Sequence, residues 1–208
     1  MDFSNADWIF EPEKYEITSE SVKITTMPGT DFWQRTYYGF RNDNAPSLLL
    51  ESCENFTFTA KMDFVYGSMF DQCGLVIYED HDNWFKVSVE SETPEISRLG
   101  SVVTNNGYSD WASIDIEPVN SIWFRLSRRG PDFLIESSED GRQFSQMRVF
   151  HMHFLGETTE TMGKSEPPVP NSLSVKFGLY ACSPLETSFE AVFTELKIEN
   201  CIWKMHLA

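Results

Sequence analysis

The 208-residue chain is poor in basic residues, in cysteine and in long hydrophobic runs. It contains 16 lysines and arginines against 32 aspartates and glutamates, so its formal net charge is −16 at pH 7. This charge repels the phosphates of nucleic acids and of anionic lipids, and we therefore expect neither nucleic acid nor a membrane as a partner. No segment approaches the roughly 20 apolar residues of a membrane span, and the first residues lack a secretion signal. We expect a soluble, cytoplasmic protein.

The four cysteines, Cys53, Cys73, Cys182 and Cys201, are widely spaced, and no pair has the spacing of a metal knuckle. In a reducing cytosol we expect all of them to be thiols. Cys73 alternates with apolar residues, which is typical of a small buried hydrophobe.

Metal and cofactor signals are weak. His151 and His153 would put two imidazoles on one face of a strand, but no third ligand is evident. Acidic and amide residues at 42–44 and 80–83 imitate a calcium loop, and turn chemistry explains them first. We predict no metal and no cofactor.

Alternation of apolar and polar residues is the main pattern in the chain. In Asn55–Phe64, Phe56 and Phe58 point one way while Thr57 and Thr59 point the other, as on a strand with one buried face. The pattern recurs between turn residues in Cys73–Tyr78, Trp84–Glu90, Ile122–Ser127, Phe133–Ser137, Met147–Phe154, Ser174–Tyr180 and Phe189–Ile198. Amphipathic helical patterns are almost absent. We therefore predict an all-β sandwich.

The length favours one domain, because β-sandwiches often reach about 200–250 residues as a single unit. We predict a single domain over residues 1–208, with residues 156–171 as a mobile loop that is rich in Thr, Glu, Gly and Pro. Lys14–Thr26 alternates well enough for two edge strands. Thr104–Trp111 is interpreted as a longer loop.

Sorting each strand by parity separates an inner from an outer set of side chains. If Phe85 and Val87 face the core, Trp84, Lys86 and Glu90 face outward. The same sorting of the other strands predicts an outer set of Gln72, Tyr78, Trp84, Lys86, Glu90, Trp123, Arg125 and Tyr180. Aromatic rings interleaved with amide, carboxylate and guanidinium groups suit a polyhydroxylated ligand. Alternatively, another segment covers this face and the tryptophans are second-layer packing.

Several runs in the chain carry a family resemblance: Asp31–Phe40, Phe70–Leu75, Ser97–Asn105, Tyr108–Trp111 and Gly178–Pro184. Together they resemble the uncharacterised domains named after a yeast protein called regulation of enolase, in the concanavalin A-like lectin/glucanase superfamily. The resemblance covers about residues 3–198. It implies a concanavalin A-like jelly-roll sandwich of two curved antiparallel sheets. Superfamily relatives bind or cleave carbohydrates on the concave sheet, but a fold does not carry a function with it.

The leading hypothesis is a non-catalytic binding module that holds a saccharide, a sugar phosphate or another small polar ligand on the concave sheet. Trp84 and Tyr180 would stack on the ligand, and Gln34, Arg35 and Tyr37 would close one end of the site. The full set of predicted ligand-binding residues is Gln34, Arg35, Tyr37, Gln72, Trp84, Lys86, Glu90, Arg98, Trp123, Arg125 and Tyr180.

Two alternatives stay open. The family's name suggests a protein that regulates a metabolic enzyme through its acidic surface. A glycoside hydrolase would need two carboxylates at close range, and the nearest candidates are Glu90–Glu92 and Asp115–Glu117. Neither pair has the third acid of the glucanase strand motif, so we favour binding over catalysis.

Overall fold

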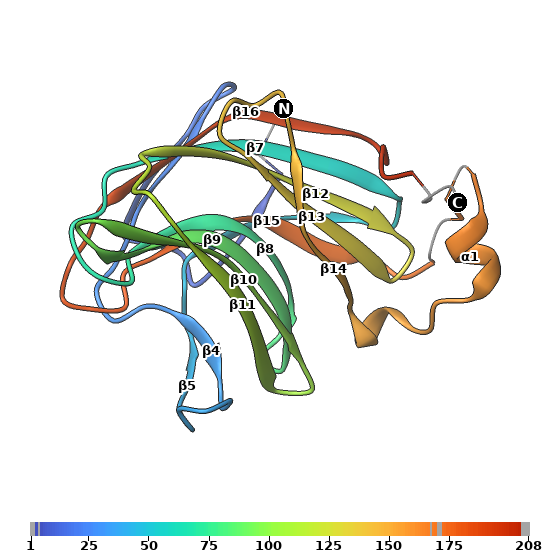
Figure 1. Ribbon diagram of the computed structural model, residues 1–208, viewed down its shortest axis with the longest axis horizontal. Coiled ribbons are helices and arrows are strands. Elements are labelled where there is room, and N and C mark those ends of the chain that lie inside the picture. The colour runs from blue at the N-terminus through green and yellow to red at the C-terminus, as the bar shows by residue number, and fades with distance from the viewer. Residues whose placement is uncertain (1–2, 4, 167, 170–171, 205–208) are drawn as a thin grey trace.

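The structure, a computed structural model, describes the whole chain except residues 1–2, 4, 167, 170–171 and 205–208. Its main feature is a pair of seven-stranded sheets packed face to face (Figure 1). Sheet A contains, in spatial order, β1 (Asp7–Ile9), β6 (Ser47–Ser52), β15 (Val175–Cys182), β8 (Gln72–Asp80), β9 (Asn83–Thr93), β10 (Ile96–Asn105) and β11 (Tyr108–Ile116). Sheet B contains β14 (Ser145–His151), β13 (Asp132–Ser138), β12 (Ser121–Arg129), β7 (Phe56–Phe64), β16 (Glu190–Asn200), β3 (Val22–Thr25) and β2 (Lys14–Ile17).

The pairings within both sheets are antiparallel, which confirms the predicted two-sheet sandwich. The main core lies between the sheets. Leu75 and Phe85 of sheet A and Phe58 and Phe124 of sheet B are all fully buried there. The assignment of inward and outward side chains from the sequence is therefore correct, because the apolar residues that it assigns to the core face the opposite sheet. Cys73 is buried in this core as predicted, and all four cysteines are free.

A small hairpin, β4 (Phe32–Gln34) paired with β5 (Arg41–Asp43), stands apart from both sheets. Figure 1 shows it below the curved strands β8–β11, on the concave side of their arc. Sheet A therefore has an outer face that is partly roofed by the chain itself.

Two predicted segments differ from the structure. Thr104–Trp111 is not a loop, because β10 and β11 run through it and turn at Asn106 and Gly107, both with positive φ. The long strand β11 escaped notice because it is an edge strand with most of its side chains exposed, so it lacks apolar alternation. The strand predicted to reach Phe154 ends at His151 and continues as the 3-10 turn η1 (His153–Leu155).

The segment predicted to be a mobile loop, residues 156–171, contains a short helix, α1 (Glu160–Lys164). Thr159 caps this helix by accepting a hydrogen bond from the Met162 amide. Residues 167 and 170–171 of the segment lie outside the described residues. Across the described part of the chain, no helix is long and apolar enough to cross a bilayer.

Candidate functional site

The register of sheet A places its outward-facing residues in rows that cross four neighbouring strands. The first row is polar and charged: Gln72, Glu90, Arg98 and Asp115. The second row is small: Gly74, Ser88, Gly100 and Ser113. The third row is larger again: Val76, Lys86, Val102 and Trp111. Because the second row has little side-chain volume, it forms the floor of a depression between two raised rows.

The β4–β5 hairpin closes the depression at one end by packing on a second apolar cluster. Phe32 is fully buried there, with its ring centroid 5.4 Å from that of Trp84, 5.8 Å from Tyr78 and 6.1 Å from Tyr180. The hydroxyl of Tyr78 donates to the Asp43 carboxylate of the hairpin at 3.2 Å. The hairpin is thus held by both apolar and polar contacts. Other side chains of the hairpin face the depression.

The result is a cavity of about 420 Å³, a volume within the usual range of small-ligand sites. Its walls come from the hairpin, from β8 to β11 and from the segment after β15. Its lining combines aromatic side chains with charged and amide side chains: Asp31, Trp33, Tyr38, Phe40, Phe70, Gln72, Lys86, Glu90, Glu92, Arg98 and Trp111.

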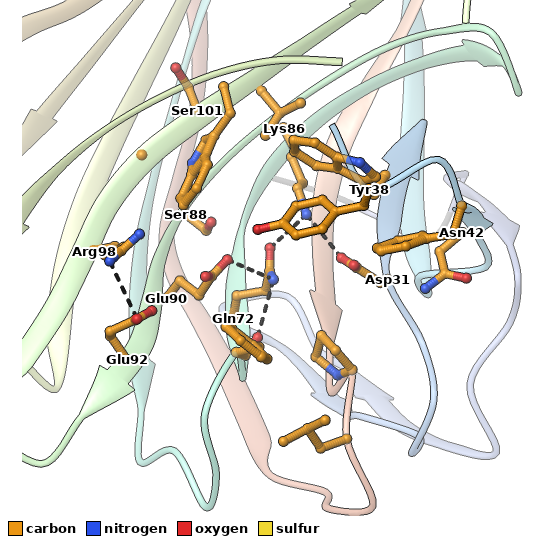
Figure 2. A pocket seen from close by; sticks show the side chains of 18 residues that line it. Asp31, Tyr38, Asn42, Gln72, Lys86, Ser88, Glu90, Glu92, Arg98 and Ser101 are labelled. Atoms are coloured by element: carbon orange, nitrogen blue, oxygen red, sulfur yellow. Dashed lines mark hydrogen bonds and ion pairs between the residues drawn. The ribbon is translucent and has the colours of Figure 1, made fainter. Parts of the chain in front are cut away.

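A chain of hydrogen bonds crosses the cavity, and Gln72 is its centre (Figure 2). The Gln72 carbonyl oxygen accepts from Lys86 Nζ at 2.9 Å and from the Tyr180 hydroxyl at 3.0 Å. The amide nitrogen donates to Glu90 Oε2 and to the Phe70 carbonyl oxygen, both at 3.1 Å. Gln72 thereby uses two donors and two acceptor sites, the full capacity of a carboxamide.

Lys86 is buried at the other end of this chain, with its Nζ 3.0 Å from Asp31 Oδ1. Burial lowers the pKa of Lys86, but the Asp31 and Glu90 carboxylates and the nearby Cys182 outweigh it and hold the pKa above its usual value. Lys86 therefore stays protonated, with Asp31 and Gln72 fixing two of its three donors.

Of the ionisable groups that line the cavity, Glu90 has the most strongly shifted pKa. Burial raises its pKa from 4.5 to about 7, and the Asp31 and Glu92 charges add to this effect, while Lys86 and Arg98 oppose it. Its Oε2 accepts from Gln72, and its Oε1 has no hydrogen-bond partner in the described part of the chain. Glu90 therefore offers an open acceptor near neutral pH.

Arg98 borders the cavity on the side of the edge strand. Its guanidinium lies 3.3 Å from Glu92 and 3.6 Å from Asp115, and it sits over the Trp111 ring at 5.5 Å from the centroid. Trp33 meets Trp111 nearly at a right angle, with ring centroids 6.5 Å apart. These contacts fix an aromatic wall that includes a cation already held against one ring.

Four of the predicted ligand-binding residues, Gln72, Lys86, Glu90 and Arg98, line this cavity together. Trp84 and Tyr180 do not. Both are fully buried under the hairpin, so they have no surface with which to stack on a ligand, and that prediction is wrong. The alternative interpretation, second-layer packing, is the correct one for Trp84.

Trp123 and Arg125 are also misplaced by the prediction. They lie on β12 of sheet B, so the same outward parity turns them to the opposite side of the sandwich. There Trp123 Nε1 donates to Glu195 at 3.0 Å, and Arg125 forms a bidentate pair with Glu136 at 2.7 and 2.8 Å. Parity gives the direction of a side chain relative to its own sheet but does not say which sheet holds the strand.

The hairpin closes one end of the site, but through residues other than those predicted. Gln34 is buried, Arg35 Nη1 donates to the Gly107 carbonyl oxygen at 2.6 Å, and Tyr37 is 92% exposed at the tip. The hairpin residues that face the cavity are Trp33, Tyr38, Phe40 and Asn42. The aromatic residues of Asp31–Tyr38 and of the run that ends at Trp111 are visible in the sequence. The direction of their side chains is not, because the hairpin and the edge strand that carry them show no apolar alternation.

The paired histidines have a local role. His151 Nδ1 lies 2.8 Å from Asp132 Oδ1, and its ring meets that of His153 edge-on at 5.0 Å. Within the described residues, no group of three or more histidine, cysteine, aspartate or glutamate side chains could hold a metal ion.

The fold and the cavity define a class of protein: a two-sheet antiparallel β-sandwich with a pocket on the outer face of one sheet. Similar folds occur in a GH43 protein from Bacillus licheniformis (TM-score 0.64, 13% identity, 90% of this chain and 35% of that one) and in the alginate lyase of Klebsiella pneumoniae (TM-score 0.55, 10% identity, 90% and 84%). At these identities the similarity concerns the fold alone.

The chain belongs to the DUF1349 family, described as proteins of unknown function, whose model matches residues 8–201. It is 26% identical over 195 residues to regulation of enolase protein 1 of Saccharomyces cerevisiae, covering 93% of this chain and 89% of the yeast protein. A solved structure of a functionally unknown protein from Saccharomyces cerevisiae superposes with a TM-score of 0.81 at 25% identity, over 98% of this chain and all of that one. The predicted family resemblance is confirmed.

Proposed function

We propose that this protein is a non-catalytic binding module that holds a small carbohydrate-like ligand in the cavity on the concave face of sheet A. One observation carries the proposal: a cavity of about 420 Å³ combines an aromatic wall with polar groups that other side chains hold in place. Flat apolar surface and oriented polar groups are what a polyhydroxylated ligand requires. The fold similarity to carbohydrate-active proteins supports the proposal.

Trp111 and Trp123 offer a matched test. Both are partly exposed tryptophans with a cation over the ring, but Trp111 faces the cavity and Trp123 lies on sheet B. A thermal-shift screen of mono- and disaccharides should find ligands that stabilise the native protein and Trp123→Ala, and Trp111→Ala should bind the same ligands at least about tenfold more weakly. An equal loss of ligand affinity in the two variants contradicts the proposal. So does a screen in which no saccharide shifts the melting temperature.

The pKa of Glu90 favours a second candidate, a glycoside hydrolase. A carboxyl group that titrates at about pH 7 in a cavity can act as a general acid, and Glu92 lies two residues along the same strand. Under this candidate, Glu90→Gln would abolish hydrolysis of an aryl glycoside that the native protein cleaves. Unchanged hydrolysis would exclude Glu90 as the catalyst.

The yeast relative's name supports a third candidate, an interaction with a metabolic enzyme such as enolase. With a net charge of −16, the surface would meet a basic region of its partner. Affinity purification should then recover the enzyme at low ionic strength and lose it at about 0.5 M salt, because screening weakens the attraction. Recovery that is absent, or unaffected by salt, would argue against this candidate.

A further inference from the structure

The polar groups that line the cavity differ in what they have left to offer a ligand. Gln72 has no unused hydrogen-bonding capacity, and Lys86 directs two of its three donors to Asp31 and Gln72. In contrast, Glu90 Oε1 and Asp31 Oδ2 have no hydrogen-bond partner within the described residues. Apart from the third donor of Lys86, the open groups among these four residues are therefore carboxylate oxygens, which accept hydrogen bonds and carry negative charge.

The formal charges of the lining point the same way. Three carboxylates, Asp31, Glu90 and Glu92, face two cations, Lys86 and Arg98. Arg98 is further opposed by Asp115 at 3.6 Å, outside the lining. The positive groups are thus matched within the protein, and one negative charge remains without a counterion when Glu90 is ionised. Burial raises the pKa of Glu90 to about 7, and the nearby cations Lys86 and Arg98 do not fully offset this effect.

The aromatic wall also favours a cation. Trp33 makes an angle of 88° with the Trp111 ring and of 72° with the Tyr38 ring, so neighbouring walls present π-faces in different directions. The faces of aromatic rings carry partial negative charge and attract ammonium groups. Arg98 over Trp111 is one such contact within the protein itself.

We infer that the cavity selects a ligand bearing a protonated amino group, with an amino sugar as the representative class, over neutral and anionic ligands of the same size. The amino group would donate to the open oxygen of Glu90 and lie against the aromatic wall. This inference rests on the proposed function, because both require the cavity to be the binding site. It goes further by excluding sugar phosphates as preferred ligands.

Three hexoses that differ in charge provide the test: glucosamine, glucose and glucose 6-phosphate. By titration calorimetry at about pH 6.5, glucosamine should bind about tenfold more tightly than glucose, and glucose 6-phosphate should bind most weakly. Glu90→Gln should reduce the preference for glucosamine over glucose to less than about threefold. Glu199→Gln, which removes a carboxylate on β16 of sheet B, should keep the full preference.

A second readout follows the proton. Glucosamine binding to the native protein should release a proton from Glu90, so the measured enthalpy should differ between buffers of different ionisation enthalpy. In Glu90→Gln this difference should be smaller. Equal or tighter binding of glucose or glucose 6-phosphate overturns the selectivity for an amine and leaves the proposed function standing. Failure of all three sugars to bind overturns the selectivity, and failure across the wider saccharide screen overturns the proposed function as well.

Discussion

At the scale of single residues, Gln72 links the two ends of the cavity. Replacing it by leucine would leave Lys86 and Glu90 without a shared partner and would remove the acceptor to which the buried Tyr180 hydroxyl donates. Because unmet buried polar groups are expensive, we expect Gln72→Leu to lower the free energy of unfolding by about 3 kcal/mol. Urea denaturation measures this. Gln146→Leu, at an exposed position of β14, is the control and should change it by less than about 0.5 kcal/mol.

Glu90 couples stability to pH. In the folded protein its carboxyl holds its proton up to about pH 7, whereas in the unfolded chain it loses the proton near 4.5. Between these values the folded state binds more protons, so this group makes the free energy of unfolding fall as pH rises from about 4.5 to 7. The fall is at most about 3 kcal/mol and persists above pH 7.

We therefore predict that Glu90→Gln, which cannot ionise, is more stable relative to the native protein at pH 8 than at pH 4.5. Urea denaturation across this range gives the two profiles. Glu92→Gln, two residues along β9 and paired with Arg98 in the native protein, tests whether the effect belongs to Glu90. Parallel profiles for native protein and Glu90→Gln would contradict the assignment.

At the scale of elements, the β4–β5 hairpin depends on the anchoring of one ring. Phe32 packs on Trp84, Tyr78 and Tyr180, so Phe32→Ala should lower the free energy of unfolding by about 3–5 kcal/mol. It should also expose tryptophan to acrylamide quenching, because Trp84 lies directly beneath. Tyr37→Ala, five residues away at the exposed tip, should change neither measurement. Equal effects in the two variants would show that the hairpin is not anchored in this way.

Sheet A also depends on strand glycines that allow backbones to approach closely. A Cβ at Gly74 would lie 1.8 Å from the Val87 carbonyl oxygen, where no atom fits. Gly74→Ala should therefore lower the free energy of unfolding by about 3 kcal/mol or more. In α1, nothing lies within 4 Å of a Cβ at Gly163. Gly163→Ala should therefore raise the free energy of unfolding by about 0.5–1 kcal/mol. Thermal and urea denaturation of both variants check the two signs.

At the scale of the whole molecule, the net charge of −16 opposes the compact state. The Debye length falls from about 30 Å at 0.01 M salt to about 10 Å at 0.1 M, so added salt screens this repulsion. We expect NaCl at about 0.15 M to raise the melting temperature at pH 7 by about 2–4 °C over the value at 0.01 M. Scanning calorimetry measures the shift, and a melting temperature that stays constant or falls would contradict it.

The sequence by itself determined the sandwich and the direction of most side chains. Alternation with a period of two follows from strand geometry, so Phe85 had to face the core once Trp84 faced away. The same alternation placed Gln72, Lys86 and Glu90 on one outer face, where the structure has them.

Only the tertiary structure decided which outer face each strand contributes to and what covers it. Trp123 points away from the core as Trp84 does, but it lies on the other sheet. Trp84 is buried beneath a hairpin that shows no alternation of its own. Sheet membership and roofing depend on contacts between segments far apart in the chain. A local pattern of residues indicates only the direction of each side chain relative to its own strand, and contacts between distant segments do not change that pattern.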